Sequence, residues 1–334
     1  MNTKKVLKYA VSLLVAALLM YFSFRGVDWA GFARDLKLCR WGWIALAAAS
    51  SVAAFYFRSQ RWKCLLRPID PTIDSLTTFN CVNIGYLANF VFPRIGEVVR
   101  CGFINSRSAS RHKDDPQNIA TFDKTLGTVL MSRSWDVAVV LLLFGVLLAA
   151  RWERFGDFFI HRMWAPFTQK QDFNAWWLVA AGMVLLVALG AAAYLLRGRS
   201  KALGKVADLG KGILRGFASW ARMRGKWLFF IWTLLLWGMY FLMSYAVIRA
   251  MPALDALAGV DALFISVAGS FAWMVPVPGG FGAYHYIVAL ALSSVYSLSW
   301  EAGIMCATLN HETQAITMVV CGLVSYIIET IRKK

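Results

Sequence analysis

Residues 89–100 read Asn-Phe-Val-Phe-Pro-Arg-Ile-Gly-Glu-Val-Val-Arg and lie between two apolar segments. The proline and the glycine interrupt a helix and free backbone groups, which at membrane depth must be covered by protein or water. The stretch also carries one carboxylate and two guanidinium groups, which are costly in a bilayer unless they pair or line a wet cavity. It therefore predicts a broken, polar element within an apolar protein.

A second interrupted stretch lies in the other half of the chain. Residues 275–285 read Val-Pro-Val-Pro-Gly-Gly-Phe-Gly-Ala-Tyr-His. Broken apolar segments at corresponding positions of two halves usually mark the substrate site of a transporter. We therefore expect the two interruptions to face each other and to form the functional site.

Composition places the chain in the membrane. It has 334 residues, of which 59% are hydrophobic and 16% charged, whereas soluble domains are about 45–50% apolar and about 25% charged. The net charge of +17 is explained by cationic cytoplasmic loops and attraction to anionic lipid. No nucleic-acid-binding motif accompanies this charge, so we expect no nucleic-acid partner. The six cysteines are scattered without a CxxC pair, which argues against a disulfide framework.

The apolar segments predict an all-α polytopic fold. With Lys and Arg marking the cytoplasmic side, we predict about six transmembrane helices, at residues 6–24, 41–57, 118–150, 176–196, 227–248 and 301–331. Residues 75–105 and 261–298 are predicted re-entrant hairpins, each folded around one of the interruptions. The whole chain, 1–334, is then one membrane domain made of two inverted repeats, 1–150 and 176–331.

The loops between these segments set the predicted orientation. Arg58, Arg61, Lys63 and Arg67 have no acid among them and are interpreted as marking the cytoplasmic side. Residues 25–40 and 151–175 are predicted external loops. Residues 197–226 hold nine Lys or Arg and one Asp, with apolar residues at helical spacing, which predicts a basic amphipathic helix on the inner leaflet. The chain is thus predicted to lie in a bacterial-type inner membrane with both termini in the cytoplasm.

The first interruption supplies candidate ligand contacts. Arg94 and Arg100 can bind an anionic phosphate group, since guanidinium forks match phosphate geometry, and Glu97 can orient them. The alternative is an internal Glu–Arg pair that only stabilises the hairpin. Gly96 belongs to the same break, and Asn89 lies close enough to be a ligand contact.

The second interruption supplies the opposite wall of the predicted site. Pro278, Gly279, Gly280 and Gly282 either shape the backbone or expose amides that bind an anion. His285 is either a proton-responsive ligand contact or a satisfied core histidine.

Two further groups of charged or polar residues follow the hairpins. Arg133 and Asp136 are three residues apart and are predicted to form an intramembrane pair with a structural or gating role. A second set lies within one helical turn facing the predicted cavity: His311, Glu312 and Gln314. His285, His311 and Glu312 are not expected to bind a metal ion, because the adjacent residues 311 and 312 point in different directions on a helix. No cofactor is expected either.

Three motifs together resemble a known family. They are Pro93-Arg94-x-Gly96-Glu97-x-x-Arg100, Arg133-x-x-Asp136 and Pro278-Gly279-Gly280-Phe-Gly282. The chain resembles, over nearly its whole length, the lysylphosphatidylglycerol synthase transmembrane-region family of flippase-like proteins. The resemblance implies lipid handling, because in larger relatives this module moves aminoacylated lipid across the bilayer. Those relatives also carry a soluble synthase domain, so aminoacyl transfer is not expected of a chain that ends after its last span. Many relatives have a glutamate near the position of His285, which leaves the lipid headgroup open.

Three functions are compatible with these residues and with the family resemblance. The favoured one is translocation of an anionic phospholipid or a polyprenyl-phosphate-type lipid by alternating access between the hairpins. The second is a membrane transferase acting on a lipid phosphate, with Glu97 or the His311/Glu312 pair as general base. The third is a scaffold for a separate lipid-modifying enzyme. The sequence shows no nucleotide-binding loop and no nucleophile motif, so we expect the chain not to be an enzyme.

Overall fold

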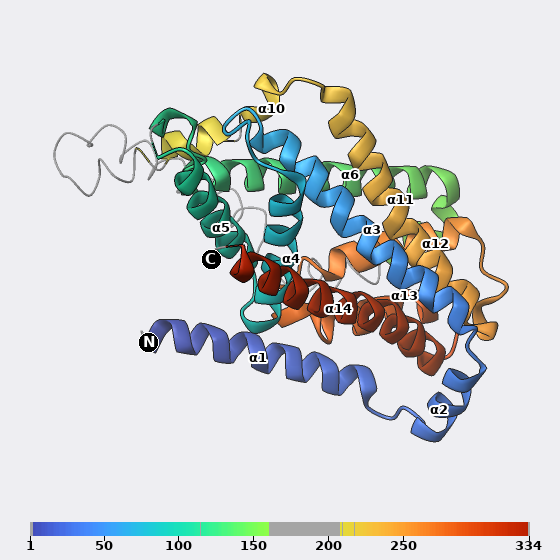
Figure 1. Ribbon diagram of the computed structural model, residues 1–334. Helices are drawn as coiled ribbons and strands as arrows, with labels where there is room; N and C mark the ends of the chain where they lie inside the picture. The colour runs from blue at the N-terminus through green and yellow to red at the C-terminus, as the bar shows by residue number, and fades with distance from the viewer. Residues whose placement is uncertain (1–2, 114, 160–207, 209, 217, 333–334) are drawn as a thin grey trace, which may run out of the picture.

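The computed structural model describes residues 3–113, 115–159, 208, 210–216 and 218–332. Every regular element in these ranges is a helix (Figure 1). Before residue 160 the α-helices are α1 (Thr3–Phe24), α2 (Trp29–Leu38), α3 (Trp41–Leu66), α4 (Ser75–Val91), α5 (Gly96–Arg111) and α6 (Phe122–Asp157). After residue 217 they are α10 (Ser219–Arg222), α11 (Lys226–Ala250), α12 (Gly259–Ala272), α13 (Ala283–Tyr296) and α14 (Trp300–Ile331). Short 3-10 turns are η1 (Pro116–Asn118), η3 (Pro252–Leu254) and η4 (Pro278–Gly280).

Several of these helices are built to cross a membrane. Among the described residues, three are long and apolar enough: Phe122–Gly156, Lys226–Ala250 and Trp300–Ile331. A fourth candidate is the pair Val11–Phe24 and Trp29–Leu38, bent by 82°. The chain is therefore an all-helical membrane protein with three or four clear candidate spans in its described part. The count of six stays a prediction, and the predicted span at 176–196 lies outside the described residues.

The outer faces of the long helices are apolar, as lipid contact requires. On α14, the exposed residues include Ile316, Val320, Leu323 and Ile327. On the opposite side of the same helix, His311 and Glu329 are buried in the protein. A helix with apolar residues outside and polar residues inside suits a bundle in a bilayer, where the polar groups face protein or water.

The predicted loop at 25–40 is wrong in its central part, which forms α2. Gly26, with φ of +80°, supplies the sharp bend after α1. The Asp28 side chain then accepts a hydrogen bond from the Ala30 N–H at 3.0 Å and caps the new helix. A capping aspartate of this kind satisfies one of the free N–H groups of the first turn.

The predicted loop at 151–175 also begins too early. Helix α6 continues to Asp157, with a kink at Arg151, whose φ and ψ are −152° and 58°. The extension is held by packing: Phe155 is fully buried and stacks on Phe264 of α12 with ring centroids 4.6 Å apart. The rest of this loop, from residue 160, lies outside the described residues.

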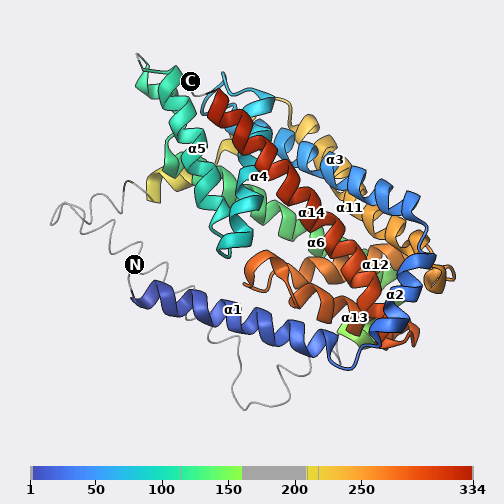
Figure 2. The same cartoon turned by 60° about the horizontal axis from the view of Figure 1, so that its bottom comes forward.

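Two helical hairpins form where the sequence predicts them. Helices α4 and α5 pack against each other around the break at residues 92–95, and α12 and α13 pack around the break at 273–282. Helix α14 lies beside α4 and α13 and so connects both hairpins. In both views the two tips point toward each other near the centre of the molecule (Figures 1 and 2). Their depth in the bilayer and the inverted-repeat relation stay predictions.

The chain ends lie toward the same end of the molecule. Helix α1 begins and α14 finishes on the side where α5 also ends (Figures 1 and 2). This arrangement is compatible with the prediction that both termini are cytoplasmic, which stays a prediction. Of the predicted basic amphipathic segment, residues 197–207 lie outside the described residues, and its described part includes the short helix α10.

Candidate functional site

The two hairpin tips touch each other. The Arg94 Nη2 atom donates a hydrogen bond to the Met274 carbonyl oxygen at 2.8 Å. The rings of Phe90 and Phe281 meet edge to face with centroids 5.9 Å apart. The structure thus brings together the two interruptions, which are about 180 residues apart in the chain.

Arg94 occupies an unusual backbone position. Its φ of 60° lies in the left-handed region, which non-glycine residues adopt at a cost of roughly 1–2 kcal/mol. Glycine would fit this turn without that cost. The arginine at this position therefore gives the tip a side chain that reaches the other hairpin, at the expense of local backbone strain.

Gly96 and Asn89 close the first hairpin. A Cβ atom on Gly96 would lie 2.0 Å from the Gly85 carbonyl oxygen, so α4 and α5 approach each other closely at this point. The Asn89 Oδ1 atom accepts a hydrogen bond from the Gly96 N–H at 2.7 Å. Both predicted ligand contacts therefore have a structural role that the sequence did not indicate.

A cluster of charged residues joins the first hairpin to α3 and α6. We call it the arginine cluster: Arg58, Arg61, Glu97, Arg100, Arg133 and Asp136. Asp136 Oδ2 accepts from Arg58 Nη1 at 2.8 Å, and Asp136 Oδ1 accepts from Arg61 Nη2 at 2.6 Å. The pairing predicted between Arg133 and Asp136 is looser, at 4.0 Å between Nη1 and Oδ2.

Glu97 binds an arginine other than the two expected from the sequence. Its Oε1 atom accepts from Arg133 Nη2, so Glu97 orients Arg133 rather than Arg94 or Arg100. The sequence could not show this, because Arg133 lies 36 residues further along the chain. Arg133 thereby connects the two carboxylates of the arginine cluster.

Arg100 is buried, and no carboxylate of the described residues pairs with it. It is 5% exposed, and its guanidinium carbon lies 4.8 Å from the centroid of the Trp62 ring. Within the described residues, its Nε and Nη2 atoms have no hydrogen-bond acceptor, and the same holds for Nε and Nη1 of Arg61. Buried guanidinium donors without acceptors are costly. They are the feature of this fold that most clearly suits an anionic ligand.

That Arg58 and Arg61 mark the cytoplasmic side stays a prediction. Both side chains are nevertheless buried in the protein rather than exposed in a loop, because α3 continues to Leu66. The physical reason is their shared partner Asp136, which lies on α6 and offers an acceptor to each. One signal could have revealed them: two arginines stand three residues apart beside an apolar helix with no nearby acid, so their partner must come from another segment.

The second break is shaped by glycine. Gly279, Gly280 and Gly282 have φ values of +58°, +77° and +76°. A Cβ atom on Gly282 would lie 2.7 Å from the Met20 backbone nitrogen, so this glycine lets α1 pack against the break. The Ser12 hydroxyl of α1 donates to the Pro276 carbonyl oxygen at 2.7 Å. Of the two roles considered for these residues, the geometry favours backbone shaping, with Pro278 buried in the turn.

His285, His311 and Glu312 come together behind this break. His311 Nδ1 lies 3.0 Å and His285 Nε2 lies 3.4 Å from Glu312 Oε1. The expectation that adjacent residues 311 and 312 point apart is therefore wrong, because the flexible Glu312 side chain bends back toward the ring. Gln314 is half-buried on the same helix, and its backbone carbonyl oxygen accepts a hydrogen bond from Thr317 Oγ1 at 2.8 Å.

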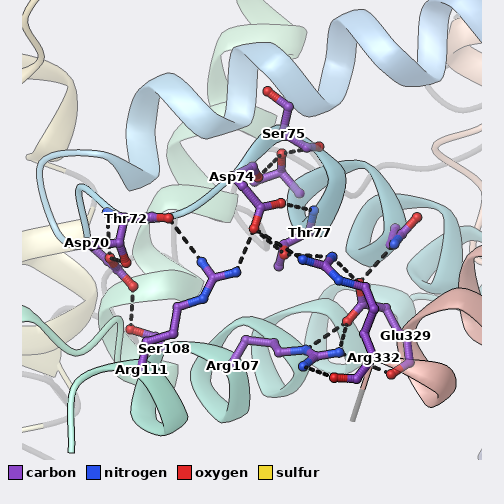
Figure 3. A network of polar contacts seen from close by, with 12 residues as sticks. Asp70, Thr72, Asp74, Ser75, Thr77, Arg107, Ser108, Arg111, Glu329 and Arg332 are labelled. Carbon is purple, nitrogen blue, oxygen red and sulfur yellow. Dashed lines mark hydrogen bonds and ion pairs between the residues drawn. The ribbon is translucent and has the colours of Figure 1, made fainter. Parts of the chain in front are cut away.

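A separate polar network joins the base of the first hairpin to the end of α14 (Figure 3). Asp74 caps α4 by accepting from the Thr77 N–H at 2.6 Å. It also pairs with Arg111 at 2.6 Å and with Arg332 at 3.5 Å. Glu329 pairs with Arg107 at 2.6 Å. None of these pairs was predicted from the sequence, because most of the partners come from segments far apart in the chain.

We expect Asp74→Ala to lower the free energy of unfolding by about 1–2 kcal/mol at neutral pH, the usual effect of losing a helix cap. Partial burial acts to raise the pKa of Asp74, but the Thr77 N–H and the Arg111 guanidinium lower it from 3.8 to about 2. A lowered pKa means that the ionised group stabilises the fold above pH 4, and that this contribution is lost as the pH falls through 2.

Thermal melting of both proteins in detergent across this range checks the Asp74 prediction. The two melting temperatures should converge as the pH falls from 4 toward 2. A constant difference would show that the charge of Asp74 does not matter.

Comparison with known proteins supports the membrane assignment. Residues 9–322 match the family model described as the lysylphosphatidylglycerol synthase TM region. Searches of curated proteins and of solved structures found no match. The match covers both hairpins and the arginine cluster. The chain therefore belongs to the lysylphosphatidylglycerol synthase TM region family, a family of lipid-related membrane proteins.

Proposed function

We propose that the protein translocates an anionic lipid, a phospholipid or a polyprenyl-phosphate-type lipid, whose headgroup binds at the arginine cluster. The observation that carries this proposal is the charge of the cluster. Four guanidinium groups face two carboxylates, and two of the arginines keep buried donors without acceptors in the described structure. A phosphate group would supply both the missing negative charge and the missing acceptors.

In the proposed transport cycle, the contact between the two hairpin tips breaks and re-forms. Arg94 bonds across the hairpin tips to a backbone carbonyl, and beside it the rings of Phe90 and Phe281 are in contact. A neutral carbonyl holds an arginine less strongly than a phosphate does, since the phosphate adds the attraction of opposite charges and can accept two parallel N–H bonds. An arriving headgroup can therefore compete for Arg94 and separate the tips, as alternating access requires.

Transport without chemistry fits the environment of Glu97 better than catalysis does. A lipid transferase would need a general base, and Glu97 is a candidate by position. Its Oε1 atom is bound by the Arg133 guanidinium, which favours a fixed negative charge over proton transfer. We therefore propose that the chain is not itself an enzyme. A role as scaffold for a separate lipid-modifying enzyme requires no anion site and would not need these arginines.

Arg100→Gln tests the proposed headgroup site. We expect translocation of labelled phosphatidylglycerol in proteoliposomes to fall at least about 10-fold, the usual effect of losing one charge-assisted contact worth about 1.5–3 kcal/mol. The melting temperature should stay the same or rise, because the variant removes a buried charge that has no carboxylate partner of its own. A purely structural arginine would show the opposite pattern, with lower stability and unchanged specific activity.

Matched variants and lipids sharpen this test. Arg40→Gln is the control, since Arg40 forms a half-exposed pair with Asp255 away from the cluster; it should leave translocation unchanged. Arg100→Lys should recover part of the activity. Native mass spectrometry of the wild type and of Arg94→Ala/Arg100→Ala identifies the lipid class that is lost. Wild-type translocation by folded Arg100→Gln with both phosphatidylglycerol and a polyprenyl phosphate would refute the proposal.

A further inference from the structure

Three potential metal ligands meet in the second half of the molecule. His285 lies in the first turn of α13, and His311 and Glu312 lie in the middle of α14. One ligand atom from each of these residues lies within 4.8 Å of the other two. Both imidazole rings are about 1% exposed, whereas the Glu312 side chain is 34% exposed. This group is separate from the arginine cluster and has no role in the proposed headgroup site.

The hydrogen bonding of His311 fixes which of its nitrogens is free to bind. Its Nε2 atom lies 2.9 Å from the Gly279 carbonyl oxygen. A carbonyl can only accept, so Nε2 carries the hydrogen, and in a neutral ring Nδ1 is then an acceptor. Nδ1 faces Glu312 Oε1, which is also an acceptor, at 3.0 Å. A cation is needed to make this contact favourable.

His285 adds a third ligand atom to the contact between His311 and Glu312. A proton can join two of the three ligand atoms, whereas a metal ion binds all three. The distances to Glu312 Oε1 are 3.0 Å from His311 and 3.4 Å from His285. Around a tetrahedral zinc ion with bonds of about 2.0–2.1 Å, neighbouring ligand atoms lie about 3.3 Å apart. The second distance is also longer than the usual 2.9–3.0 Å of an N–H···O hydrogen bond.

The surroundings hold the His311 ring in the orientation that a ligand needs. The Gly279 carbonyl is the typical outer partner of a metal-bound histidine, which donates its other N–H to a carbonyl or carboxylate. The ring stacks on Trp273 with centroids 5.6 Å apart and meets Phe281 edge to face at 5.0 Å. The break in the second hairpin supplies all three of these contacts, so the turn and the ring position are coupled.

We propose that His285, His311 and Glu312 bind a divalent transition-metal ion that fastens the second hairpin to α14. Two imidazoles and one carboxylate suit first-row metals such as Zn²⁺, whereas Mg²⁺ and Ca²⁺ prefer oxygen ligands. Three protein ligands leave a fourth tetrahedral position for water or another oxygen. Of the three ligands, Glu312 is the accessible one, with 34% of its side chain exposed.

The test measures zinc binding directly. Protein purified with a histidine-free affinity tag is stripped with a chelator, loaded with Zn²⁺, desalted and analysed for metal by mass spectrometry. We expect one zinc ion per chain and a higher melting temperature with Zn²⁺, since a ligand that binds only the folded state stabilises it. His285→Gln and Glu312→Gln should each weaken zinc binding by at least about 10-fold and remove the zinc-dependent rise in melting temperature.

A control variant tests whether zinc binding is specific to this site, and Co²⁺ absorption identifies the ligand atoms. His112→Gln should bind zinc like the wild type, because His112 lies by Asp70 at the base of the first hairpin. Co²⁺ bound to the wild type should give the absorption of a nitrogen- and oxygen-ligated ion, without a thiolate charge-transfer band. The proposal is overturned if the wild type retains no metal, if both variants retain all of it, or if a thiolate band appears. Because the arginine cluster is separate, none of these results changes the expectation for Arg100→Gln.

Discussion

Asp136→Asn is expected to lower the free energy of unfolding by about 3–5 kcal/mol, the usual effect of removing one partner of a buried ion pair. Asp136 is the common acceptor for Arg58 and Arg61, whose side chains are 8% and 0% exposed. Asparagine keeps the shape but removes the negative charge, so two buried guanidinium groups lose their counter-ion. Thermal melting in detergent and the yield of monodisperse protein measure the effect.

The control for this change is Asp28→Asn. Asp28 pairs with Arg34 at 3.9 Å, with both side chains mostly exposed, and asparagine caps a helix about as well as aspartate. We expect a change of about 0.5 kcal/mol or less. A triple apolar variant, Arg58→Leu/Arg61→Met/Asp136→Leu, should recover much of the lost stability, because apolar packing often replaces a buried ion pair without loss. If Asp136→Asn melts at the same temperature as the wild type, the pairing of Asp136 with Arg58 and Arg61 is contradicted.

Gly96→Ala is the second change with a large expected effect. The new methyl group would lie 2.0 Å from the Gly85 carbonyl oxygen and 2.7 Å from its carbonyl carbon. Because these are backbone atoms, no side-chain rotation can relieve the clash, and α4 and α5 must move apart. We expect a loss of about 3 kcal/mol or more, at the upper end of overpacking effects. The Asn89 bond to the Gly96 N–H should also be lost, which would release the hairpin tip.

Gly102→Ala is the matched control, on the same helix. Within the described structure, nothing lies within 4 Å of a Cβ atom at position 102. Alanine in an exposed helix interior is favoured over glycine by about 1 kcal/mol, so this variant should melt at the same or a slightly higher temperature. Melting curves of the two variants, together with lipid translocation, separate the packing effect from helix propensity. If Gly96→Ala melts like Gly102→Ala, the close approach of the two helices is incorrect.

Two different roles are expected within the arginine cluster, one in stability and one in lipid movement. Asp136 with Arg58 and Arg61 fixes α6 to α3, so loss of the carboxylate should strongly destabilise the protein. Arg100 lies at the same cluster without a carboxylate of its own, so its loss should spare the fold and reduce lipid movement. Under the proposed function, a buried cation such as Arg100 is kept for ligand binding and not for stability.

The amino-acid sequence by itself determined the membrane class, the helical fold and the positions of both hairpins. These properties follow from local chemistry: an apolar run forms a helix in a bilayer, and proline or several glycines end it. The motif Pro93-Arg94-x-Gly96-Glu97-x-x-Arg100, together with Arg133-x-x-Asp136 and Pro278-Gly279-Gly280-Phe-Gly282, also indicated the family, which the match over residues 9–322 confirmed.

Only the tertiary structure decided which charged groups are partners. Arg133 bonds to Glu97 instead of mainly to Asp136, and Asp136 bonds to two arginines that the sequence had placed at a cytoplasmic boundary. The meeting of Glu312 with His285 and His311 likewise depends on how α13 packs on α14. The physical reason is that an ion pair depends on distance in space, and folding brings together helices whose residues are tens to hundreds of positions apart in the chain.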